Sequence, residues 1–198
     1  MRVDGSKISA VMLDRDGVIN RELGRGVLSW DEFEFLPGVL DALRRLAEWR
    51  VPIVVLSNQA AIGRGWVSAD VVDGIHQKMV HAIEEHGGRI DDIVLCPHAP
   101  EADCLCRKPL PGLLLQAAEK HRFDVQRAIM VGDSHRDVQA AQAAGATPIM
   151  VCSGHPIPPE LERRLLREHV TIVADLAAVA DPMMRGFPFS AGRVAAKI

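Results

Sequence analysis

The stretch ISAVMLDRDG, residues 8–17, decides the fold of this chain. Residues 8–13 are small, apolar or β-branched, which predicts a buried strand, and Asp14, Asp16 and Gly17 follow it directly. Paired carboxylates at a strand end repel each other unless a cation binds there, so a magnesium site would explain them economically. An acidic turn is the other interpretation of this fragment alone, because Asp and Gly are also the common turn residues.

Similar apolar runs recur along the chain and alternate with amphipathic segments. The further strands are predicted at residues 51–56, 92–96, 127–131, 147–151 and 170–174. The helices are predicted at residues 38–48, from an N-cap at Ser68 to about His86, at residues 111–121, and at residues 135–144 before Gly145. This alternation predicts an α/β fold with a doubly wound, mainly parallel sheet, in which ligands bind outside the carboxyl ends of the strands.

The bulk properties of the chain narrow its class. A length of 198 residues suits one domain, which we expect over residues 1–181, with a C-terminal tail at 182–198. The net charge of −3 and the low aromatic content argue against nucleic-acid partners, including those of a nucleic-acid-binding zinc protein. Residues 1–7 lack a signal-peptide core, and no apolar run reaches the length of a membrane span. We therefore expect a soluble, cytoplasmic protein without membrane partners and, given its small size, a monomer.

Polar side chains also follow other predicted strands. Ser57, Asn58 and Gln59 follow the second strand, and the set of Asp133, Ser134 and Asp137 follows the fourth. Together with Asp14, Asp16 and Lys108, these positions would supply a nucleophile, an acid/base, a hydroxyl donor, a metal ligand and a cation. Phosphoryl transfer needs these groups. For Asp137 alone, a role as a first-turn helix acid is an equally good interpretation.

Cysteines concentrate in the long connection at residues 96–109. Cys96, His98, Cys104 and Cys106 form a Cys₃His set that predicts a closed, structural zinc site. Reduced surface cysteines, or oxidation of Cys104 with Cys106, are the alternatives. Cys152 ends an apolar run, and we expect it to be a buried, inert thiol.

Four motifs in order, LDRDGVIN (13–20), LSNQ (56–59), CRKP (106–109) and VGDSHRD (131–137), resemble those of haloacid dehalogenase superfamily phosphatases. The resemblance covers most of residues 8–154. It implies that Asp14 is the nucleophile, that Asp16 is the general acid/base, and that Ser57 and Lys108 contact the transferring phosphoryl group. It also implies that Asp14, the Asp16 carbonyl and Asp133 bind Mg²⁺, with support from Asp137 and Ser134.

Substrate contacts are assigned by the same resemblance. Candidates are Asn58, Gln59, Arg107, Arg64 and, in a loop cap at residues 20–37, Glu22 with Gly24 and Arg25. Each residue of the cap could equally be part of a solvated loop.

The zinc motif resembles a branch that acts on heptose bisphosphates or histidinol phosphate, so the partner is expected to be a small sugar-phosphate-like metabolite. The segments at 63–65 and 109–112 favour the heptose enzymes, whereas Ala61 and Val18 depart from their usual glycine and threonine. The spacing of the zinc loop does not distinguish the heptose enzymes from the histidinol-phosphate enzymes. A module that binds phosphorylated ligands without catalysis is a further alternative, and the presence of both Asp14 and Asp16 argues against it.

Overall fold

Within residues 8–181, the sheet of this protein has six parallel strands. The computed structural model describes residues 8–181, so the predicted tail at 182–198 and the residues before Ile8 lie outside the described residues. The strand order is β3-β2-β1-β4-β5-β6, which confirms the predicted doubly wound sheet. The strands are β1 Val11–Leu13, β2 Ile53–Asn58, β3 Asp92–Cys96, β4 Ile129–Gly132, β5 Thr147–Val151 and β6 Thr171–Val173.

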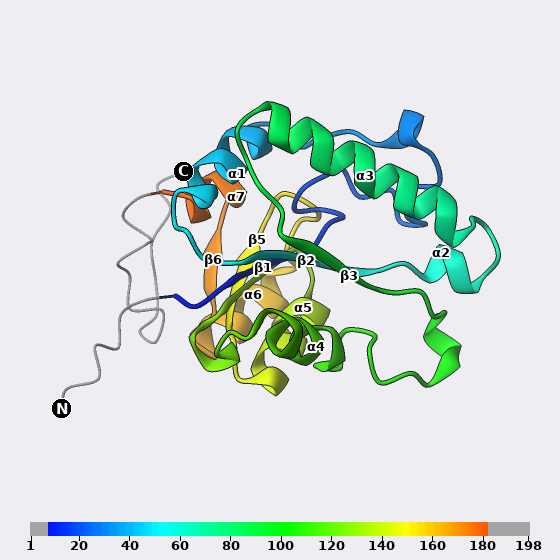
Figure 1. Cartoon of the computed structure of the whole chain (residues 1–198). Helices are drawn as coiled ribbons and strands as arrows, with labels where there is room; N and C mark the ends of the chain where they lie inside the picture. The colour runs from blue at the N-terminus through cyan, green and yellow to red at the C-terminus, as the bar shows by residue number, and fades with distance from the viewer. Residues whose placement is uncertain (1–7, 182–198) are drawn as a thin grey trace.

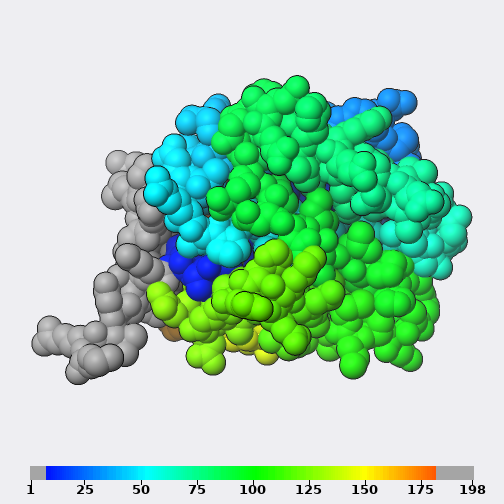
Figure 2. Space-filling model, viewed as in Figure 1, coloured from blue at the N-terminus to red at the C-terminus, as the bar shows by residue number. Residues whose placement is uncertain are grey.

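Helices cover both faces of the sheet. The α-helices are α1 Val39–Ala47, α2 Ala60–Gly63, α3 Ala69–Glu85, α4 Gly112–His121, α5 His135–Ala144, α6 Pro159–Arg167 and α7 Leu176–Val179. Short 3-10 turns lie at η1 Trp30–Glu32, η2 Pro100–Ala102 and η3 Val125–Arg127. Helices α1, α3 and α7 lie on one face, and α4, α5 and α6 lie on the other (Figure 1). The space-filling view from the same side shows that α3, α4 and the segment after β3 hide most of the sheet (Figure 2).

The alternation of side chains along β1 explains these layers. Val11 and Leu13 join a core cluster with residues of α1, α3 and α7, whereas Met12 packs into a second cluster with residues of α4 and α5. Successive side chains of a strand point to opposite faces, so a strand covered by helices on both sides must be apolar throughout. The continuous apolar run before Asp14 is therefore a consequence of its central position in the sheet.

The predicted bounds agree with the structure to within a few residues. Those of β3, β5 and α5 agree fully, and Ser68 caps α3 by accepting a hydrogen bond from the Val71 backbone at 3.3 Å. The predicted first strand is too long at its start, because pairing with both neighbouring strands begins only at Val11. Residues 51–52 precede β2, which instead continues to Asn58.

Three helices do not appear among the predicted elements. Helices α2 and α7 have four residues each, which is too short for a helical period to be visible. Helix α6 begins at Pro159, and proline is favoured in the first turn of a helix, so this signal was present in the sequence. Within residues 8–181, no helix combines the length and apolar character needed to cross a bilayer.

The expectation for Cys152 is wrong. This residue is exposed, whereas its neighbour Val151 is buried. Strand β5 ends at Val151, so the chain leaves the sheet at Cys152 and its side chain no longer faces a helix layer.

Candidate active site

Acidic side chains from two neighbouring strand ends converge at the centre of the sheet. Asp14 follows β1 and Asp133 follows β4, and these strands pair at the point where the strand order reverses. One carboxylate oxygen from each of Asp14, Asp133 and Asp137 lies within 4.8 Å of the others. The structure thus brings together Asp14 and Asp133, as the sequence predicted, and places Asp137 beside them.

The raised pKa values of this acidic cluster indicate that Lys108 offsets only part of its negative charge. Burial, together with the charges of Asp137 and Asp133, raises the pKa of Asp14 to about 8, although Lys108 opposes the shift. Burial and Asp137 raise the pKa of Asp133 to about 6. Carboxylates that hold protons near neutral pH are suited to a hard divalent cation, which takes oxygen ligands and favours their ionised forms. The donor set therefore fits Mg²⁺.

Lys108 supplies the cation of the site. Its side chain is 2% exposed, and its Nζ lies 2.9 Å from Asp14 Oδ1 and 2.6 Å from Asp137 Oδ1. Nζ also donates to the Leu56 carbonyl at 2.7 Å. Burial disfavours the ammonium, but the two carboxylates outweigh it and raise the pKa of Lys108. A fixed, fully charged lysine beside Asp14 is available to neutralise an incoming anion.

Asn58 fixes the backbone of Lys108. Its amide nitrogen donates to the Lys108 carbonyl at 3.0 Å, and its amide oxygen accepts from the Lys108 backbone nitrogen at 3.1 Å. Asn58 lines the cavity, as expected for a substrate contact, but both ends of its amide are occupied. Its contacts point to a role in placing Lys108.

Asp16 is held by hydrogen-bond donors on several sides. Arg15 Nη2 lies 2.9 Å from both carboxylate oxygens, Asn20 donates to Oδ1 at 2.9 Å, and Gln59 donates to Oδ2 at 3.1 Å. Burial opposes ionisation, but the charge and hydrogen bonds of Arg15 outweigh it, so the pKa of Asp16 is lowered. Gln59 also donates to Ser57 Oγ at 2.7 Å, which links the end of β2 to Asp16.

Local backbone geometry makes room for Asp133 and holds Asp137. A Cβ atom at Gly17 or Gly154 would overlap the Asp133 carboxylate, and Gly17 also adopts a φ of +82°. Ser134 caps α5, and its backbone and hydroxyl both donate to Asp137 Oδ2. The capping box therefore orients the carboxylate whose other oxygen contacts Lys108.

A cavity of about 390 Å³ opens over these groups. The cap segment contributes Glu22, Gly24 and Arg25 to its lining, and Arg64 and Arg107 lie at other points of the wall. Several of these groups already have partners. Arg25 pairs with Glu32 at 2.7 Å, Arg107 donates to the His98 carbonyl at 3.2 Å, and Glu22 accepts a hydrogen bond from the Gly24 backbone. The predicted substrate contacts thus lie around one cavity, which Asp14, Asp16 and Asp133 also line.

The sequence did not single out some of the polar residues at this site. His155 Nδ1 lies 3.2 Å from Asp133 Oδ2, and Arg136 lines the cavity from the first turn of α5. His155 follows β5, so the rule that ligands bind beyond strand ends could have identified it. Arg136 lies inside the VGDSHRD motif, between Ser134 and Asp137. The contacts of the Arg15 side chain cross to α3, and no local pattern indicates them.

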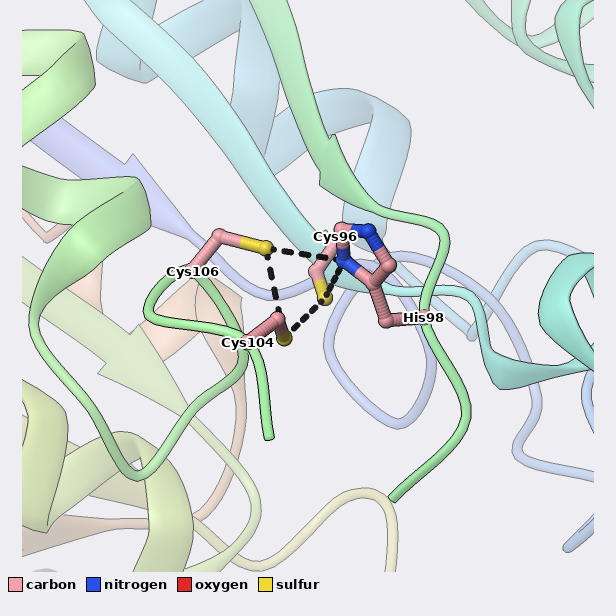
Figure 3. A group of neighbouring side chains, drawn as sticks. All are labelled: Cys96, His98, Cys104 and Cys106. Carbon is pink, nitrogen blue, oxygen red and sulfur yellow. Dashed lines mark hydrogen bonds between the residues drawn. The ribbon is translucent and has the colours of Figure 1, made fainter. Parts of the chain in front are cut away.

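The cysteine cluster lies at the end of β3. Figure 3 shows Cys96, His98, Cys104 and Cys106 pointing toward one another, with hydrogen bonds that connect them in a ring. The sulfur and Nδ1 atoms are separated by 3.3 to 3.5 Å along this ring. These distances are far longer than a disulfide bond and close to the edge of about 3.8 Å expected for four sulfur ligands in a zinc tetrahedron. The set therefore suits a zinc ion.

Comparisons with known proteins agree with this geometry. A family model of HAD-hydrolase-like proteins matches residues 105–179. D-glycero-beta-D-manno-heptose-1,7-bisphosphate 7-phosphatase of Bordetella bronchiseptica is 39% identical over 175 residues, which cover 88% of this chain and 97% of the relative. The enzyme of the same name from Escherichia coli K12 is 39% identical over 163 residues, which cover 78% of this chain and 85% of the relative.

Solved structures of heptose bisphosphate phosphatases are also similar to this chain. The crystal structure of D,D-heptose 1,7-bisphosphate phosphatase from B. bronchiseptica, complexed with magnesium and phosphate, superposes with a TM-score of 0.79 and 38% identity. The match covers 89% of this chain and 98% of that chain. The corresponding protein from Burkholderia thailandensis has a TM-score of 0.62 at 34% identity, and the match covers 87% and 96% of the two chains. This chain therefore belongs to the HAD-like hydrolases, as a phosphatase of the group that contains these heptose bisphosphate enzymes.

Proposed function

We propose that this phosphatase hydrolyses a sugar bisphosphate with Mg²⁺ through a covalent phosphate on Asp14, and that its substrate is D-glycero-D-manno-heptose 1,7-bisphosphate, cleaved at the 7-phosphate. One observation carries the proposal. Asp14 and Asp133, which line one cavity, have carboxylate oxygens within 4.8 Å of each other, and Lys108 Nζ lies 2.9 Å from Asp14 Oδ1. The names of the relatives support the substrate, and the magnesium and phosphate bound to the Bordetella structure support the cofactor.

Asp14 is placed to act as the nucleophile. Its Oδ1 accepts from the Arg15 backbone nitrogen at 2.7 Å and contacts Lys108, whereas no residue among 8–181 donates to Oδ2. Oδ2 is therefore the oxygen that attacks phosphorus as the bond to the sugar oxygen breaks. Asp14, the Asp16 carbonyl and Asp133 would hold Mg²⁺, which when bound screens the repulsion between carboxylate and phosphate. Ser57 and Lys108 would stabilise the charge of the transferring group.

Asp16 would move the protons. In the free protein, Arg15 favours the ionised form of Asp16. A phosphate dianion that arrives beside Asp16 favours its protonated form. Protonated Asp16 gives its proton to the leaving sugar alkoxide, and the resulting carboxylate takes a proton from the water that attacks phosphorus. That second attack releases inorganic phosphate and regenerates the Asp14 carboxylate.

The wall of the cavity suits a substrate with a second anionic group. Arg107 and Arg136 line the cavity apart from Lys108, so positive charge remains for a phosphate that does not react. Arg64 also lines the cavity, with its Nη2 3.9 Å from Glu101 Oε1. Histidinol phosphate has only one phosphate, so this distribution of charge favours a bisphosphate. The zinc site proposed at Cys96, His98, Cys104 and Cys106 would fix the loop that leads into Arg107 and Lys108.

A turnover screen tests the proposed substrate. Purified protein with Mg²⁺ is compared on the two anomers of heptose 1,7-bisphosphate, histidinol phosphate and other sugar phosphates. We expect one heptose anomer to exceed the other compounds by at least about a hundredfold in kcat/KM, which equals roughly 2.7 kcal/mol of transition-state binding. A preference for histidinol phosphate would instead place the protein among the histidinol-phosphate phosphatases. The absence of turnover with every phosphate ester would favour a phospho-ligand-binding module.

A further inference from the structure

A series of buried hydrogen bonds links helix α3 to the active site. Arg15 lies between the two active-site aspartates and is fully buried, and His76 of α3 is 4% exposed. Arg15 Nη1 lies 2.9 Å from His76 Nε2, while Nη2 lies 2.9 Å from both oxygens of Asp16. The proposed phosphoryl transfer assigns no role to His76.

The direction of the hydrogen bond between them follows from chemistry. A guanidinium has only N–H donors, so His76 Nε2 must accept, and the ring must be neutral with its proton on Nδ1. Burial, followed by the adjacent Arg15 charge, lowers the pKa of His76 to about 4, which agrees with a neutral ring. His76 is therefore an uncharged hydrogen-bond acceptor for Arg15, and Arg15 is the cation that contacts Asp16.

The orientation of Arg15 depends on these contacts. Its Nε is buried and has no hydrogen-bond partner among residues 8–181, so the side chain is held through its two terminal nitrogens. A planar guanidinium that is fixed at Nη1 presents Nη2 in one direction only. Asn20 and Gln59 complete the environment of the Asp16 carboxylate, but neither carries a charge.

We propose that His76 is a positioning residue that acts through Arg15 to hold the Asp16 carboxylate where it exchanges protons with the substrate oxygen and with water. This inference rests on the proposed function, in which Asp16 is the general acid/base. Loss of the acceptor at position 76 leaves Nη1 unpaired in the interior, so Arg15 shifts and Asp16 loses its charged partner on one side.

The basicity of the leaving group separates this role from a purely structural one. A sugar alkoxide is a poor leaving group and needs a proton from Asp16, whereas p-nitrophenolate departs without one. A misplaced Asp16 therefore slows the sugar phosphate much more than p-nitrophenyl phosphate. General damage to the fold or to the metal site slows both esters alike.

The experiment compares four variants with the wild-type protein on both esters in the presence of Mg²⁺. His76→Phe removes the acceptor at similar size, His76→Gln retains an acceptor, and Asp16→Asn gives the effect of losing the acid/base. Ile75→Val, at the buried neighbour of His76 on α3, controls for altered packing. We expect His76→Phe to lower kcat/KM for the sugar phosphate by at least about tenfold more than for p-nitrophenyl phosphate, in the direction of Asp16→Asn. His76→Gln and Ile75→Val should keep the wild-type ratio within about threefold.

If His76→Phe lowered kcat/KM equally for both esters, the inference would be overturned. The proposed function would remain intact, provided that Asp16→Asn still lowers kcat/KM more for the sugar phosphate than for p-nitrophenyl phosphate. A crystal structure of His76→Phe gives a second test that needs no turnover. We expect the bonds from Arg15 Nη2 to the two Asp16 oxygens to be lost or lengthened beyond about 3.5 Å. If both bonds persist at their wild-type length, His76 does not position Asp16. Failure of the wild-type protein to hydrolyse any phosphate ester would refute the proposed function, and the variant structure would then decide the positioning role alone.

Discussion

Lys108 Nζ lies 2.9 Å from Asp14 Oδ1, so the loop that carries the cysteine cluster reaches the carboxylate at the end of the first strand. Cys106 precedes Lys108 by two residues, and Asn58 holds the Lys108 backbone from the end of β2. Three segments that are distant in sequence therefore determine the position of one cation. The proposed catalytic roles depend on this arrangement.

Asp14→Asn should abolish hydrolysis while the fold is preserved. The amide has nearly the shape of the carboxylate but is a poor nucleophile, so we expect kcat to fall by more than about a thousandfold. Because the Asp14 carboxylate is difficult to ionise in its buried position, the neutral amide should leave the metal-free protein at least as stable at neutral pH. Phosphate release and thermal unfolding measure the two effects. Retained turnover in a folded variant would exclude Asp14 as the nucleophile.

The apparent affinity for Mg²⁺ should rise with pH. In the metal-free fold the pKa of Asp14 is raised from 3.8 to about 8 and that of Asp133 from 3.8 to about 6. The folded chain therefore keeps protons that the unfolded chain releases between about pH 4 and 8, and the free energy of unfolding of the metal-free protein falls as pH rises through this window. Magnesium must displace the same protons. We expect calorimetric titrations to give tighter binding at about pH 8.5 than at about pH 5.5, by at least about tenfold. Equal affinity at both values would show that these carboxylates do not bind the metal.

The cysteine cluster should contain one zinc per chain in protein purified without added metal, because four protein ligands close a tetrahedral site. Cys106→Ser should lose most of this zinc and make the segment at 97–109 sensitive to proteases, since the segment has little core of its own. Cys152→Ser, at an exposed cysteine away from the cluster, should keep the zinc. Elemental analysis and limited proteolysis measure the two results. Wild-type protein without zinc would remove this site from the proposal.

Gly154→Ala should weaken the metal site, because the added Cβ would overlap the Asp133 carboxylate. We expect the affinity for Mg²⁺ to fall by about tenfold or more and the fold to lose about 1–3 kcal/mol. Gly74→Ala provides the matched control, since its Cβ would meet nothing within 4 Å on α3 and should stabilise the helix by about 0.5–1 kcal/mol. Magnesium titration and chemical denaturation of both variants measure these effects. Unchanged affinity in Gly154→Ala would mean that Asp133 tolerates displacement and is not a critical ligand.

Local patterns were sufficient to predict the sheet and the edge at which the site lies. The apolar runs before Asp14 and Asp133 predicted strands buried on both faces, and parallel strands place their carboxyl ends together. The same rule, extended to β5, would have included His155. Short elements such as α2 and α7 could not be predicted, because four residues are too few to show a helical period.

The sequence by itself determined the strands, the helices α1, α3, α4 and α5, the pair of carboxylates after β1 and the spacing of the Cys₃His set. These features depend on residue type and on periodicity along one segment. Only the tertiary structure decided that Asn58 binds the Lys108 backbone, that Arg15 contacts His76 of α3, and that Cys152 is exposed. Side-chain direction and burial arise from packing between segments, and no local pattern records which distant donor meets which acceptor.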